Sequence, residues 1–76
     1  MKNEKVVAII NYKAISEQDV TLIQMMADGM TAIEIAPHFK VSHRTIESWV
    51  SKLLKLLELK NSYGLIALFF RQGLIK

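Results

Sequence analysis

The sequence contains no cysteine, a single proline and only two histidines among its 76 residues. Without cysteine the chain can form neither disulfide bonds nor thiolate metal sites, and it is compatible with a reducing compartment. His38 and His43 are five positions apart, which places them on different faces of a helix, so no zinc site is expected. The sequence also offers no carboxylate pair, no nucleophile beside a base and no phosphate-binding loop. We therefore expect neither an enzyme nor a cofactor.

Long apolar stretches are also missing. The longest apolar runs, Val6–Ile10 and Leu65–Phe70, are far shorter than the ~20 residues that cross a bilayer. The first of these runs follows the N-terminal lysines but is too short for a signal peptide, and Glu4 precedes it. We therefore expect a cytoplasmic protein that does not contact the membrane.

The chain has the length of one small domain, with 51% hydrophobic residues and a net charge of +3. A chain of this size buries only about 60% of its unfolded surface, so a second copy could complete its core. Residues 14–39 contain four acidic side chains and no lysine or arginine, whereas residues 40–60 contain five basic side chains and two acidic ones. This segregation is typical of a nucleic-acid binder, although ordinary solvated helices show it too.

Capping signals predict four helices joined by short turns. Ser16–Asp19 and Thr31–Glu34 have the spacing of capping boxes, and Ser42 and Asn61 are suited to begin the third and fourth helices. The predicted ends are Asp28-Gly29, Lys40-Val41, the region of Glu58 and the region of Gly73. The sequence therefore predicts an all-α domain over residues 15–76.

Residues 1–14 form a separate N-terminal segment. The β-branched run Val6–Ile10 favours a strand, which in a helical domain could pair only with another copy. An extended arm or an additional helical turn packed on the core fits the segment equally well. We therefore treat residues 1–14 as an arm or strand whose structure the sequence leaves open.

The predicted third helix, Ser42–Leu57, has two contrasting faces. Its apolar stripe consists of Ile46, Trp49, Val50, Leu53, Leu54 and Leu57. Its polar face consists of Arg44, Glu47, Ser48, Ser51, Lys52 and Lys55. Short hydrogen-bonding side chains between cations suit the major groove of DNA, although many surface helices are equally amphipathic. The preceding short helix and tight turn complete a helix-turn-helix arrangement, which favours DNA binding.

Ile15–Ile75 resembles the LuxR-type helix-turn-helix domain without a gap. The resemblance rests on Ile15-Ser16 before Asp19, on residues 25–36 (MMADGMTAIEIA), on residues 42–50 (SHRTIESWV) and on the closing segments 56–59 (LLEL) and 73–75 (GLI). Region 4 of extracytoplasmic sigma factors shares part of the pattern but fits these blocks less well. The resemblance implies a bacterial transcription regulator that binds double-stranded DNA. No receiver or ligand-binding domain accompanies it in the sequence, so a stand-alone domain is expected, and no small-molecule ligand is indicated.

The resemblance also implies roles for individual residues. Glu47, Ser48 and Ser51 occupy the base-reading positions of the family. The positions that contact phosphates are Ser42, His43, Arg44, Thr45, Lys52 and Lys55. Relatives often have lysine or arginine at the base-reading positions, so their target sequences cannot be transferred to this chain. The acid and hydroxyls there also keep an alternative open, namely a protein–protein interaction module or an antagonist of a related regulator.

Two further departures from the family pattern concern the support of the third helix. Trp49 replaces the usual histidine, and we expect it to support the helix from the apolar side rather than to stack on nucleic acid. Pro37 lies within the second helix and removes the backbone hydrogen bond to the Ile33 carbonyl, which predicts a kink or an early loosening of that helix.

The predicted last helix is apolar almost all round from Tyr63 to Phe70. Because a terminal helix buries one face only, the remainder would form an association surface. LuxR-type domains commonly pair through this helix, so the resemblance implies a homodimer. We expect its interface at Leu65, Leu68, Phe69 and Gln72. The alternative is that Val6–Ile10 covers the helix within one chain.

Overall fold

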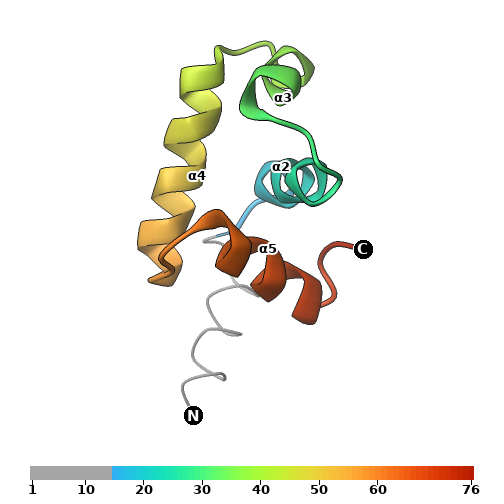
Figure 1. The fold of residues 1–76 in the computed structure, drawn as a ribbon, viewed down its shortest axis with the longest axis vertical. Helices are drawn as coiled ribbons and strands as arrows, with labels where there is room; N and C mark the ends of the chain where they lie inside the picture. The colour runs from blue at the N-terminus through green and yellow to red at the C-terminus, as the bar shows by residue number, and fades with distance from the viewer. Residues whose placement is uncertain (1–14) are drawn as a thin grey trace.

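The computed structural model describes residues 15–76, which form four α-helices joined by short turns (Figure 1). The helices are α2 (Glu17–Ala27), α3 (Ala32–Phe39), α4 (His43–Leu57) and α5 (Ser62–Arg71). The all-helical prediction for this part of the chain is confirmed. The arm or strand predicted for residues 1–14 lies outside the described residues. No helix in residues 15–76 has the length and apolar character required to span a membrane.

Each helix begins at a side chain that accepts a hydrogen bond from the first turn. The Ser16 hydroxyl accepts from the Asp19 amide at 3.2 Å, and the Asp19 carboxylate accepts from the Ser16 amide at 3.0 Å. Thr31 and Glu34 form the same reciprocal pair at 3.3 and 2.8 Å. The four capping residues are Ser16, Thr31, Ser42 and Asn61. All four predicted helix starts are therefore confirmed, and each cap contributes about 1 kcal/mol.

The helices end in left-handed or turn conformations. Gly29 follows α2 with φ of 91°, as the Asp28-Gly29 pair predicted. α3 and α4 end at Lys40 and Glu58, which adopt φ values of 59° and 56° although neither is glycine. α3 continues through Pro37 and ends at Phe39, directly before the Lys40-Val41 connection predicted as its end.

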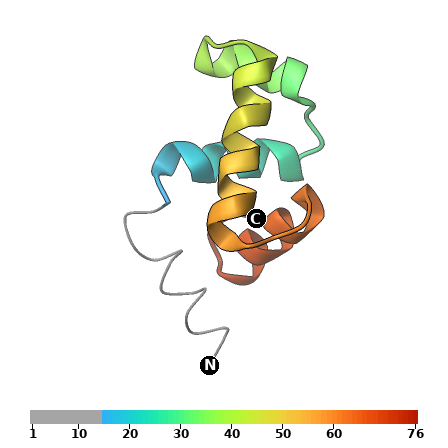
Figure 2. The same ribbon diagram turned by 90° about the vertical axis from the view of Figure 1, so that its left-hand side faces the viewer.

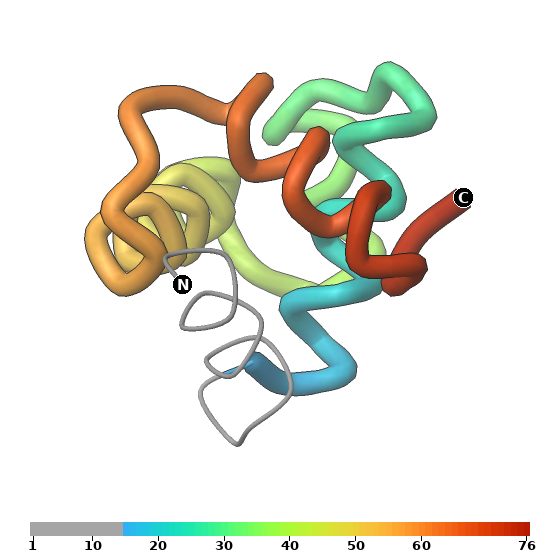
Figure 3. Tube along the Cα trace, turned by 90° about the horizontal axis from the view of Figure 1, so that it is seen from below, coloured from blue at the N-terminus to red at the C-terminus, as the bar shows by residue number. Residues whose placement is uncertain are grey.

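The core lies where the four helices meet. α3 packs on α4, and α5 packs on α2. The buried apolar side chains are Leu22, Ile23, Ile35, Ala36, Ile46, Leu53, Leu57, Leu65, Leu68, Phe69 and Ile75. Viewed from below, α5 runs away from the end of α4 and over α2 toward the C-terminus (Figure 3).

The last residues of the chain are held against α2. The Gln24 side chain accepts a hydrogen bond from the Lys76 amide at 2.8 Å and donates one to the Lys76 carbonyl at 3.1 Å. These two bonds keep Ile75 in the core, where it is 4% exposed. The C-terminal segment therefore helps to fix α5 on α2.

Candidate nucleic-acid interface

The two helices that precede and follow the Lys40–Ser42 turn form a compact unit. α3 packs directly on α4, and the turn between them is closed by a hydrogen bond of 3.2 Å from the Val41 amide to the Ala36 carbonyl. α4 stands along one side of the molecule, and Figure 2 shows it in front of α2 with its outer face toward the viewer. This arrangement presents one helix as a ridge on the surface.

The inner face of α4 anchors it to the rest of the domain. Ile46, Leu53 and Leu57 are buried in the core. Trp49, Val50 and Leu54 are half-buried beside them. The apolar stripe predicted from the sequence is therefore the face that packs inward.

Trp49 braces α4 against α3. Its ring meets the Phe39 ring edge to face, with centroids 5.5 Å apart and an interplanar angle of 82°. Phe39 makes a second edge-to-face contact with His38 at 5.1 Å. An aromatic pair of this geometry contributes about 0.5–1.5 kcal/mol beyond the area that it buries. Trp49 thus supports α4 from its apolar side, as expected.

The outer face of α4 carries the polar side chains predicted to lie there. The exposed members of this face are Arg44, Glu47, Ser48, Ser51, Lys52 and Lys55. An α-helix with side chains is about 10–12 Å across, which matches the roughly 12 Å width of the major groove. The ridge can therefore enter a duplex with its hydroxyl, carboxylate and cationic groups facing the base pairs and phosphates.

The N-terminal end of α4 contributes further predicted residues. Ser42 and His43 are exposed, whereas Thr45 is half-buried. The Ser42 hydroxyl accepts from the Thr45 amide at 3.2 Å, and the two hydroxyls lie 3.1 Å apart. Thr45 is thus part of the cap of α4, while Ser42, His43 and Arg44 lie at the accessible end of the helix.

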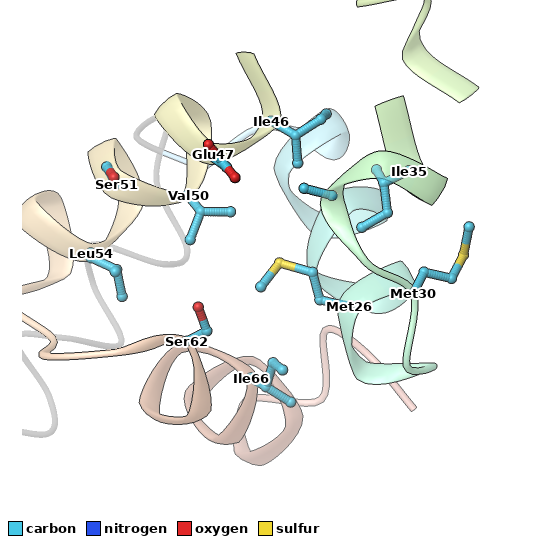
Figure 4. A pocket seen from close by; sticks show the side chains of 11 residues that line it. Met26, Met30, Ile35, Ile46, Glu47, Val50, Ser51, Leu54, Ser62 and Ile66 are labelled. Carbon is cyan, nitrogen blue, oxygen red and sulfur yellow. The ribbon is translucent and has the colours of Figure 1, made fainter. Parts of the chain in front are cut away.

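Beside this ridge lies a groove that the sequence did not predict. Its volume is about 380 Å³, and Figure 4 shows α4 on one side of it and α5 on the other. Residues from all four helices and from the α2–α3 turn line it, and two of them, Glu47 and Ser51, are also predicted base-reading residues. Because these residues are far apart in sequence, no local pattern could have indicated the groove.

The interface predicted on α5 needs correction. Leu65, Leu68 and Phe69 are buried in the chain's own core, and Gln72 is half-buried, so these residues cannot form the centre of a surface. The helix turns them inward to pack on α2 and α4. Its exposed apolar side chains are instead Tyr63 and Phe70, which are 83% and 61% exposed. They are seven positions apart and therefore lie on one face of the helix.

Residues 13–69 match the family described as "Bacterial regulatory proteins, luxR family". The match covers more than half of the chain and includes all of α2, α3 and α4. No curated protein and no solved structure matches the chain significantly. Within residues 15–76 there is no cluster of side chains suited to hold a metal ion.

Proposed function

The chain belongs to the LuxR family of bacterial regulatory proteins, which regulate transcription by binding DNA, and we propose that it binds the major groove through α4. The observation that carries this proposal is the division of α4 into an anchored apolar face and an exposed polar face. Such a helix can enter the groove without any rearrangement of the core. The proposed regulator works on the bacterial chromosome and therefore in the cytoplasm.

The exposed side chains divide into two groups by their chemistry. We assign base reading to Glu47, Ser48 and Ser51, because a carboxylate accepts from cytosine N4 and a hydroxyl both donates and accepts. The cationic side chains of Arg44, Lys52 and Lys55 contact phosphates and supply most of the affinity.

The N-terminus of α4 assists phosphate binding. Ser42 and His43 lie at the N-terminal end of α4, where the helix dipole favours an anion. Thr45 contributes by holding the Ser42 hydroxyl in place, because the two side chains are in contact at the cap.

We also propose that the protein acts as a homodimer whose interface lies on the exposed face of α5. Tyr63 and Phe70 would contact their counterparts across a twofold axis, with Gln72 at the edge of the contact. Dimeric helix-turn-helix proteins bind half-sites about 34–36 Å apart, one turn of DNA. A twofold interface on α5 would leave the two α4 helices free to occupy such half-sites.

Salt-dependent binding to a labelled DNA duplex tests the proposal. Replacing Lys52 and Lys55 by alanine should weaken binding to DNA of any sequence. A plot of log K against log salt concentration has a negative slope, and this slope should become shallower by about 1 for each phosphate that is no longer neutralised. Lys60→Ala is the matched control, because Lys60 is exposed but lies beyond the end of α4. An equal decrease of affinity in the control and the α4 variants would contradict the assignment.

The alternative function is an interaction module or an antagonist of a related regulator. The specific feature in its favour is the negatively charged Glu47 on the face proposed to meet DNA. In that case the wild-type protein would fail to bind DNA even at low salt, while the same face of α4 would bind another protein. The duplex titration separates the two functions.

A further inference from the structure

The groove between α4 and α5 has an apolar floor and a polar rim. Among its lining residues, Met26, Val50, Leu54 and Ile66 are half-buried apolar side chains, while Ile35 and Ile46 are fully buried. Figure 4 shows Glu47 and Ser51 on the α4 side and Ser62 projecting from α5 across from them. A volume of about 380 Å³ falls within the range of sites that hold small organic molecules.

The chemistry of the lining restricts the class of occupant. Glu47 is the one charged side chain among the described residues that line the groove, and no lysine or arginine accompanies it. The hydroxyls of Ser51 and Ser62 can accept hydrogen bonds from an ammonium group, whereas an anion would meet the Glu47 carboxylate. The sulfur-containing side chain of Met26, which Figure 4 shows pointing into the groove, favours contact with an aromatic ring.

From these features we infer that the groove binds a small aromatic amine. The ring lies on the apolar floor, and the ammonium group pairs with Glu47 at the rim. Because Glu47 and Ser51 also belong to the face proposed to read DNA, an amine in the groove holds these side chains away from the bases. The binding of the amine does not depend on the proposed function. Only the weaker DNA binding that follows from it rests on the proposed function.

Binding of the amine is measured without DNA. The probe is 2-phenylethylamine, titrated into the full chain labelled with ¹³C at the methionine methyl groups. We expect saturable shifts of the Met26 signal, with the weak affinity typical of a small fragment. The neutral analogue 2-phenylethanol and the anionic analogue 3-phenylpropanoate should bind more weakly, because neither can pair with a carboxylate as a cation does.

Two variants and a matched control locate the site. Glu47→Gln should weaken amine binding about two- to fivefold, the contribution of an exposed ion pair. Glu58→Gln removes the same charge at the end of α4, outside the groove, and should leave binding unchanged. Ser62→Leu fills the groove from α5 and should abolish the shifts. The inference would be overturned if the amine caused no saturable shifts, or if Glu47→Gln bound the amine as tightly as the wild-type protein does. Shifts caused by protein concentration alone would identify a second copy as the occupant and would overturn it too.

The effect on DNA is measured with Ser62→Leu, which leaves the outer face of α4 intact. In the wild-type protein, saturating 2-phenylethylamine should weaken duplex binding several-fold, beyond the effect of the same concentration of sodium chloride. Ser62→Leu should bind the duplex normally and lose this response. If the amine binds but the affinity for DNA does not change, the proposed competition between amine and DNA is wrong, while the amine site in the groove is still supported. If the protein binds no DNA, the proposed function fails while the amine titration still stands.

Discussion

At the scale of single residues, the backbone at the end of α4 is held in an unfavourable conformation. Glu58 adopts the left-handed region with φ of 56°, and the Leu59 amide then bonds to the Leu54 carbonyl at 2.9 Å. A residue with a Cβ atom in this conformation costs roughly 1–2 kcal/mol relative to its ordinary conformations, whereas glycine adopts it freely. Glu58 therefore lowers the free energy of unfolding of the domain relative to a glycine at this turn.

Glu58→Gly should relieve this strain and stabilise the domain by about 1 kcal/mol, which corresponds to about 4–8 °C in the midpoint of thermal unfolding. The measurement is thermal denaturation followed by circular dichroism. Glu47→Gly is the control, because the same replacement inside the exposed part of α4 should destabilise the domain by about 1 kcal/mol. A decrease of stability in both variants would show that Glu58 is not strained.

A second prediction at this scale concerns the aromatic contact that braces α4. Phe39→Leu and Trp49→Leu, made singly and together, form a double-mutant cycle for the edge-to-face pair. We expect a coupling free energy of about 0.5–1.5 kcal/mol from chemical denaturation. Additive effects would mean that the two rings only fill space independently.

At the scale of helices, what the sequence could predict depends on how local the determining contacts are. The starts of all four helices follow from hydrogen bonds between residues three positions apart, as in Ser16 with Asp19, so the sequence displays them directly. The inward face of α4 was also predictable, because polar and apolar residues alternate there at helical spacing. α5 has apolar residues on nearly all sides, so its inward face is decided by docking on α2 and α4. This is why Leu65 and Phe69 were expected at a surface and lie in the core.

The candidate site shows the same division. The exposed polar face of α4 belongs to one helix and could be predicted, whereas the groove joins Met26, Glu47 and Ile66 from three separate helices. Only the packing of the helices brings such residues together. The sequence could therefore indicate the proposed DNA-reading face but not the groove beside it.

The polar face of α4 gives a prediction about sequence preference. Glu47→Ala should change the bases that are preferred within the half-site, because a carboxylate that accepts from cytosine would be removed, and the discrimination involved is about 1–3 kcal/mol. Selection of bound duplexes from a random pool measures the change. Glu58→Ala serves as the control and should retain the wild-type preference. An unchanged consensus in Glu47→Ala would remove this residue from the base-reading set.

At the scale of the whole molecule, the exposed apolar side chains of α5 mark the surface on which association is proposed. Tyr63 and Phe70 are on one face of this helix, and Ile33 on α3 is another exposed apolar side chain, at 68% exposure. We expect sedimentation equilibrium to give a mass near twice the 8.7 kDa of one chain. Phe70→Ser combined with Tyr63→Ser should yield the monomer mass, whereas Ile33→Ser should not. A wild-type protein that remains monomeric at high concentration would contradict the dimer.

Amide chemical-shift mapping with a selected duplex tests most directly whether the outer face of α4 meets DNA. We expect the largest shifts on the exposed residues from Arg44 to Lys55, with small shifts around Tyr63 and Phe70 on α5. Shifts concentrated elsewhere, with the outer face of α4 unaffected at saturation, would contradict DNA binding through this helix.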